Sequence, residues 1–108
     1  MISFEHFAQC DIRIGLIIQA DIVEGADRLI VFSIDVGEEA PRTIVSGIRE
    51  FYSAPESLIG KRVPVLMNLE PRAIKGIMSE GMVLYVVGDG TLTTLEPAEE
   101  VRPGTPVH

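Results

Sequence analysis

The chain has 108 residues, an apolar fraction of 46% and a formal net charge of −7. This length fits a single domain with a real hydrophobic core, so residues 1–108 are expected to form one domain. No apolar run approaches the roughly 20 residues that span a bilayer, and the first ten residues lack the basic start of a signal peptide. The sequence therefore predicts no membrane contact.

Cysteine and histidine are too scarce for most metal or nucleophile chemistry. Cys10 is the one cysteine and cannot form an internal disulfide, which favours a reducing, cytoplasmic location. His6 and His108 stand far apart, and no ligand lies at metal-binding spacing from Cys10. There is no Gly-x-Ser-x-Gly motif and no mid-chain histidine to act as a base. We therefore expect no catalytic residue, no metal and no cofactor.

Hydrophobic periodicity predicts strands. Residues 11–20 alternate between apolar and polar or small side chains, which is typical of a half-buried strand. Gly15, in the middle of this strand, predicts a bulge or a sharp bend. The residues expected to face inward are Ile12, Ile14, Leu16, Ile18 and Ala20.

Further strands follow in chain order, separated by turns at 24–27 and 37–41. They are expected at residues 28–36, 43–48, 62–69 and 81–87, with a tight turn at 88–90, a short strand at 91–95 and one extended piece in the tail. Pro64 cannot donate to a ladder, so its strand should have an edge or a bulge there. The inward-facing sets are expected to be Ile30, Phe32, Ile34 and Val36, and then Val63, Val65, Met67 and Leu69.

Two short helical segments complete the prediction. Phe4, Phe7 and Ala8 share one face of an N-terminal helix, and residues 53–60 form one turn between Ser53 as a cap and Gly60. Five main strands with a helical turn between the third and fourth are typical of a small barrel. The predicted fold class is therefore all-β, a five-stranded Greek-key barrel of the oligonucleotide/oligosaccharide-binding (OB) type with short helical segments.

The charge is unevenly distributed. Residues 42–82 hold six basic and four acidic residues, a balance of +2, whereas the remainder holds three basic and twelve acidic residues, a balance of −9. A strongly acidic protein repels nucleic acid at long range, because phosphate binding depends on Lys and Arg. The central third could nevertheless present a cationic face on an acidic body.

Polar and small residues lie between two apolar runs at residues 68–84. Binding groups concentrate on loops held by a rigid scaffold, and this composition suits a polar, anionic ligand better than catalysis. Arg72 could grip phosphate with a bidentate fork, and Lys75 as a point charge. Few aromatic residues are available for base stacking, so Tyr52, Tyr85 and Met82 stay open as either core or ligand contacts.

Motifs along nearly the whole chain resemble the tRNA-binding domain family. The family includes a free-standing bacterial tRNA-binding protein, a C-terminal appendix of many methionyl-tRNA synthetases and chaperone-like relatives. The matching motifs are Asp11-Ile12-Arg13-Ile14-Gly15, Ala26-Asp27-Arg28-Leu29, Asp35-Val36-Gly37, Ile44-Val45-Ser46-Gly47-Ile48, Leu58-Ile59-Gly60-Lys61, Asn68-Leu69, Ser79-Glu80-Gly81-Met82 and Pro103-Gly104.

The resemblance implies an OB-fold homodimer that binds tRNA by shape, with an aminoacyl-tRNA synthetase as a possible partner. Two departures from the family pattern, Leu16 and Glu70, imply weaker RNA affinity than is typical. The implied dimer contacts are Phe4, Phe7, Val101, Pro103 and Val107. The implied RNA-binding residues are Arg42, Arg49, Asn68, Arg72, Lys75, Ser79, Glu80 and Met82.

Three function classes remain open from the sequence. The leading one is a non-enzymatic, dimeric tRNA-binding protein. The second is a chaperone-like dimer that binds peptides or proteins through an apolar groove, and the third is a purely structural dimerisation domain. RNA binding should weaken steeply as salt rises, whereas apolar peptide binding should not.

Overall fold

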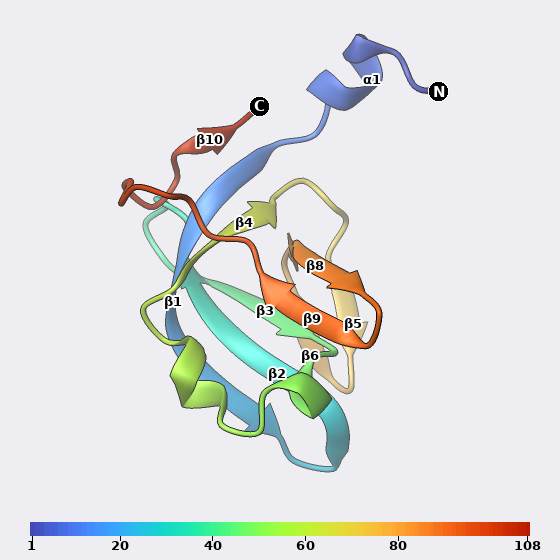
Figure 1. Ribbon diagram of the computed structural model, residues 1–108, viewed down its shortest axis with the longest axis vertical. Coiled ribbons are helices and arrows are strands. Elements are labelled where there is room, and N and C mark those ends of the chain that lie inside the picture. Colours follow the sequence, from blue (N-terminus) through green and yellow to red (C-terminus); the bar gives the residue numbers. More distant parts are fainter.

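The computed structural model describes residues 1–108, and β-strands dominate it (Figure 1). No helix is long and apolar enough to cross a membrane. The helical segments are the α-helix α1 (Phe4–Ala8) and the 3-10 turns η1 (Arg49–Phe51) and η2 (Pro55–Leu58). The strands are β1 (Ile12–Val23), β2 (Ala26–Asp35), β3 (Arg42–Ser46), β4 (Arg62–Leu66), β5 (Arg72–Ile74), β6 (Ile77–Ser79), β7 (Met82–Val83), β8 (Tyr85–Gly88), β9 (Thr91–Thr94) and β10 (Pro106–Val107).

The main sheet is antiparallel and follows the order β3-β2-β1-β4-β7, with β10 paired to β1. Two separate hairpins, β5–β6 and β8–β9, pack beside it. In Figure 1, β1 and β2 run through the body, while α1 stands off at one end near β10. The mostly β character predicted from periodicity is confirmed.

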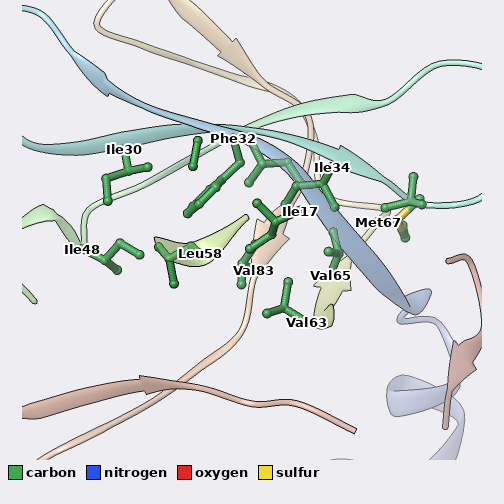
Figure 2. Packing of buried hydrophobic residues seen from close by; sticks show 13 residues of the cluster. Ile17, Ile30, Phe32, Ile34, Ile48, Leu58, Val63, Val65, Met67 and Val83 are labelled. Atoms are coloured by element: carbon green, nitrogen blue, oxygen red, sulfur yellow. The ribbon is translucent and has the colours of Figure 1, made fainter. Parts of the chain in front are cut away.

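The core is built from one face of this curved sheet. All four residues predicted to face inward on β2 are buried, as are Val63, Val65 and Met67. Figure 2 shows Leu58 of η2 and Val83 of β7 packed among these side chains. The prediction for Leu69 was wrong, because β4 ends at Leu66 and leaves the Leu69 side chain 45% exposed.

The strict alternation predicted for the first strand was also wrong. The pairing of β1 with β2 shifts register between Ile17 and Gln19. Such a bulge moves the following side chains to the opposite face. Burial therefore passes from Ile17, which is 1% exposed before the shift, to Ala20, which is 4% exposed after it, while Ile18 at the shift is 43% exposed.

Gly15 serves the core rather than marking the bulge. A Cβ built on Gly15 would stand 2.5 Å from Cγ2 of Ile34. A larger residue would have to push that buried side chain aside. Gly15 therefore allows β1 to pass close over the side chains of β2.

Pro64 pairs with Ile14 of β1 without a register shift. The backbone of Ile14 bonds instead to the tail, donating to the carbonyl of Thr105 (2.8 Å) and accepting from the N–H of Gly104 (2.7 Å). The β1–β4 ladder therefore needs no N–H from Pro64. The predicted bulge is therefore absent where β4 pairs with β1. On the opposite edge of β4, the pairing with β7 covers only Val65 and Leu66.

The helical segment between β3 and β4 differs from the prediction. It contains two 3-10 turns instead of one, and Ala54 rather than Ser53 occupies the N-cap of η2. No side chain caps η2, although the Ser57 hydroxyl donates to the Ala54 carbonyl over 2.8 Å. Pro55 starts the turn, where its missing N–H costs nothing.

Residues 72–79, for which no strand was predicted, form the β5–β6 hairpin. Lys75 and Gly76 form its two-residue loop with φ of 49° and 79°, the positive values of a type I′ turn. The strand predicted at 81–87 is divided at Leu84 into β7 and β8. The tight turn predicted at 88–90 is confirmed as the connection of the β8–β9 hairpin.

Candidate nucleic-acid interface

A groove of about 310 Å³ opens where the β5–β6 hairpin faces the end of β3 and the strand β7. We call it the seam groove. Ile48, Val83 and Tyr85 are among the residues that line it, and they belong to the core or pack against it. Exposed residues that also line it include Leu69, Glu70, Arg72 and Met82. The groove thus combines apolar surface with charges of both signs.

Arg42, one of the predicted RNA-binding residues, is tied into the fold. Its guanidinium forms a bidentate ion pair with Glu38 (2.8 and 2.9 Å) and donates through Nη1 to the carbonyls of Met67 (2.7 Å) and Glu80 (3.0 Å). The Arg42 hydrogen bond lowers the pKa of Glu38, and the same bond raises the pKa of Arg42. Arg42 therefore links the β2–β3 loop, the segment after β4 and the segment between β6 and β7, and we call it the brace.

Asn68 and Ser79 likewise hold backbone segments together. Oδ1 of Asn68 accepts from the N–H of Asp11 (2.9 Å), and its Nδ2 donates to the carbonyl of Gln9 (2.6 Å), which ties the end of β4 to the start of β1. The buried Ser79 hydroxyl accepts from the N–H of Val45 over 3.0 Å. This last bond links the β5–β6 hairpin to β3.

Glu80 turns its carboxylate toward β3. Its Oε1 accepts from the N–H of Thr43 (3.2 Å), and its own N–H donates to the Thr43 carbonyl (2.8 Å). Together with the bond from Arg42, these contacts link β3 to the segment between β6 and β7. The Glu80 carboxylate is thereby occupied by the protein backbone.

The other four predicted residues present their side chains without such partners. Arg72 and Lys75 are exposed on the β5–β6 hairpin, Arg49 is half-buried in η1, and Met82 is 43% exposed on β7. None of the three cations makes a side-chain hydrogen bond or ion pair within the protein. Arg72 and Met82 line the seam groove directly.

The two tyrosines that the sequence left open both pack against the core. The Tyr85 hydroxyl donates to Oγ of Ser46 over 2.9 Å, and burial raises the pKa of Tyr85 to about 12. Tyr85 also lines the seam groove, so it forms part of the groove wall. Neither ring is a free stacking platform of the kind that single-strand binders use.

Most other basic residues are neutralised by carboxylates. Arg13 pairs with Asp11, Lys61 with Glu96 and Arg62 with Glu100 at 3.0–3.2 Å. Arg28, which the sequence analysis did not select, is exposed and unpaired like Lys75. There was little reason in the sequence to select Arg28 as a binding residue, because the acidic residues Glu24 and Asp27 closely precede it in the chain.

The predicted dimer residues separate into two groups. Phe4, Phe7 and Val107 line a second hollow of about 360 Å³ between α1 and β10, and α1 buries none of its residues. Val101 and Pro103 lie elsewhere in the tail. The Val101 carbonyl accepts from Nε of Arg62 (2.8 Å), and Pro103 packs against the backbone of Gly37.

No three His, Cys, Asp or Glu side chains gather where they could hold a metal ion. The fold and the seam groove define a small β-rich binding domain. Residues 12–106 match the family described as "Putative tRNA binding domain". The chain therefore belongs to the tRNA-binding domain family.

Curated relatives include methionine–tRNA ligases. The chain is 48% identical to the enzyme of Bacteroides fragilis over 107 residues and 50% identical to that of Porphyromonas gingivalis over 107 residues, covering 98% of this chain in both cases. It spans only 16% and 15% of the length of those two enzymes.

Solved structures show the same fold over the whole chain. A MetRS-related protein from Pyrococcus horikoshii superposes with a TM-score of 0.92 at 31% identity, covering 100% of this chain and 98% of the other. The chaperone CsaA of Bacillus anthracis superposes with a TM-score of 0.89 at 32% identity, covering 100% and 99%.

Proposed function

We propose that this chain binds tRNA at the seam groove and the β5–β6 hairpin beside it, without catalysing a reaction. The observation that carries the proposal is the gathering of unpaired cations there. Arg72 and Lys75 stand free on the hairpin, while Arg13, Lys61 and Arg62 elsewhere are paired with carboxylates. Free guanidinium and ammonium groups can bind phosphate and release its counterions.

Within this proposal, the eight predicted residues divide into two roles. Arg49, Arg72, Lys75 and Met82 contact the RNA, because their side chains are available. The other four position that surface through the bonds described above: Arg42, Asn68, Ser79 and Glu80. Recognition would follow the shape and backbone of a structured RNA, since the rings of Tyr52 and Tyr85 pack against the core and are not free to stack bases.

The curled sheet supports the proposal that the domain is a five-stranded Greek-key barrel of the OB type. The bonds from Ser79 and Glu80 hold the end of β6 and the segment before β7 against β3, and β3 and β7 are the two ends of the strand path. Barrels of this type bind oligonucleotides on their strand faces and adjoining loops. The β5–β6 hairpin would then be an addition at the edge of that binding face.

We further propose that two copies pair through α1 and β10. Phe4 is 77% exposed and Phe7 is 40% exposed, on a helix with nothing buried. Covering such apolar side chains is favourable at about 25 cal/mol per Å². Phe4→Ser with Phe7→Ser should give a monomer in sedimentation velocity, whereas Ile59→Ser with Val87→Ser, which changes equally accessible apolar residues elsewhere, should not.

The similarity to methionine–tRNA ligases suggests where the binding is used. We propose that the domain presents tRNA to an aminoacyl-tRNA synthetase in the cytoplasm or stabilises the tRNA's folded shape. Because this chain matches only 15% to 16% of those enzymes, the synthetase could be part of the same longer chain or a separate partner.

The test is a titration of labelled bulk tRNA at low and moderate salt. Arg72→Glu with Lys75→Glu should abolish binding. Lys61→Glu with Arg102→Glu makes the same change in net charge outside the groove and should weaken binding only slightly. Equal binding by the two double variants would overturn the site assignment, and wild-type protein that does not bind at low salt would overturn the function.

The apolar surface of the seam groove favours one alternative. Leu69 and Met82 are exposed at 45% and 43%, and a flexible Met suits adaptable apolar contacts. A chaperone-like peptide binder would use these side chains, and CsaA shares the fold. Binding of an unfolded apolar peptide that persists at high salt and survives Arg72→Glu with Lys75→Glu would favour this alternative.

A further inference from the structure

We propose that Arg28 is a further tRNA-contacting residue and that the RNA backbone continues from the seam groove, past Ile74, to the β1–β2 turn. The proposal rests on the proposed function, because it extends the same binding surface. Along the chain, Arg28 lies about 20 residues or more from every predicted binding residue except Arg42. Only folding therefore brings Arg28 to the site.

Arg28 and Lys75 line one hollow of about 480 Å³. Arg28 lies on β2 just after the β1–β2 turn, and Lys75 lies at the tip of the β5–β6 hairpin. Ile74 lines both this hollow and the seam groove. The two depressions are therefore neighbouring parts of one surface, with Lys75 and Arg72 on the hairpin that separates them.

The register of β2 and β3 brings Arg28 toward η1 as well. Ile30 pairs with Ser46 in an antiparallel ladder, so residues before Ile30 lie beside residues after Ser46. A Cβ built on Gly47 would stand 4.0 Å from the Arg28 carbonyl, which agrees with this placement. Arg49 follows two residues later, and hence Arg28, Arg49, Arg72 and Lys75 surround the same end of the molecule.

The four neighbouring cations favour a polyanion as the ligand of this surface. The four cations have no ion pair within the protein, and Arg102 is the one other basic residue in that state. An apolar peptide would leave these charges unpaired, whereas an RNA backbone offers a run of phosphates that can meet several of them. Asp27 lines the same hollow, so it opposes the attraction there.

The experiment uses the full chain and labelled bulk tRNA at low salt. Arg28→Glu should weaken binding about three- to tenfold and lower the slope of log affinity against log salt by about one. Arg102→Glu carries the same charge change and should bind like the wild type. Asp27→Asn should strengthen binding, an effect opposite in sign to any loss caused by damage to the fold.

The outcomes separate the two proposals. If Arg28→Glu binds like Arg102→Glu while Arg72→Glu with Lys75→Glu loses binding, the role of Arg28 is overturned and the proposed function stands. If Arg72→Glu with Lys75→Glu also binds normally, the assignment of the binding surface to the hairpin fails and the extension fails with it. If the wild type does not bind at low salt, the proposed function itself fails. The Arg28 side chain has no hydrogen bond, so Arg28→Glu should unfold at the wild-type temperature and thereby exclude misfolding as the cause of a loss.

Discussion

The two ends of this molecule leave different kinds of surface without a partner. At the end formed by the seam groove and the β5–β6 hairpin, the unpaired groups are cations, Arg72 and Lys75 among them. At the other end, α1 stands off from the body near β10 (Figure 1). The unpartnered groups there are apolar rings, because Phe4 and Phe7 are exposed on a helix that buries none of its residues. Exposed charge attracts a polyanion, whereas exposed apolar surface attracts another apolar surface.

The comparison shows how the proposed RNA binding is compatible with a net charge of −7. Away from the groove, carboxylates form ion pairs with Arg13, Lys61 and Arg62. Glu38 forms an ion pair with Arg42 as well. The cations left free are concentrated at one end. The local distribution of unpaired charge, rather than the net charge, therefore decides where a polyanion can bind.

The largest effect is expected where the tail crosses β2 on its way to the apolar end. Gly104 has φ of +92°, and a Cβ there would stand 2.8 Å from the Val36 carbonyl oxygen. Gly104→Ala should reduce the free energy of unfolding by about 2 to 4 kcal/mol in urea. Gly25→Ala is the control, since Gly25 has φ of +79° but nothing within 4 Å, and it should cost clearly less. Equal losses would mean that the crossing is not tightly packed.

The brace at the groove end should have the next largest effect. Arg42→Met removes the bonds to Glu38 and to the carbonyls of Met67 and Glu80. We expect a loss of about 2 kcal/mol in the free energy of unfolding, because two carbonyls lose a charged donor. Arg102→Met, at an unpaired surface arginine, should change stability by less than about 0.5 kcal/mol. An Arg42→Met protein as stable as the wild type would show that Arg42 is not a brace.

Reversing one carboxylate at the seam groove should strengthen tRNA binding. Glu70 is exposed beside Arg72 in the groove lining, where it repels phosphate. Glu70→Lys should raise the affinity about three- to tenfold at low salt. Glu56→Lys makes the same charge change in η2, outside the groove lining, and should have a smaller effect in the same tRNA titration. Equal gains would indicate attraction by net charge alone.

The smallest effect concerns the pH dependence of the groove end. The folded state lowers the pKa of Glu38 from its ordinary value of 4.5, because Arg42 stabilises the carboxylate. A lowered pKa contributes stability above the unfolded pKa and loses it as the pH falls through the folded pKa. The wild type should therefore exceed Glu38→Gln in thermal stability near neutral pH by less than about 1 kcal/mol, since the pair is partly exposed. The difference should close as the pH falls below 4.5; a constant difference would contradict this origin.

The sequence predicted those parts of the fold that follow from local periodicity. The buried set at Ile30–Val36 alternates without interruption, and the predicted N-terminal helix is present as α1. The bulge after Ile17 could not be predicted, because Ile17 and Ile18 are equally apolar and only pairing with β2 decides which is buried. The β5–β6 hairpin had a sequence signal that was missed, because Gly76, which adopts positive φ readily, lies between Ile74 and Ile77.

For the candidate site, the sequence suggests which residue types are present. It does not show which of their side chains are already hydrogen-bonded within the protein. Arg42 and Arg72 look alike in the chain, yet one is fully engaged with Glu38 and two carbonyls while the other is exposed. Arg28 is the opposite case. Its acidic neighbours in the chain argued against a binding role, yet folding places Arg28 and Lys75 in the lining of one hollow. Long-range pairing decides both cases, and periodicity carries no information about it.

The most direct test of the division between the two ends is sedimentation velocity with labelled tRNA. Arg72→Glu with Lys75→Glu should remain a dimer and lose the tRNA, because only the cationic end is changed. Phe4→Ser with Phe7→Ser should become a monomer that still binds tRNA with a salt-dependent affinity. The opposite pattern, in which the hairpin variant keeps the tRNA and the helix variant loses it, would contradict the account.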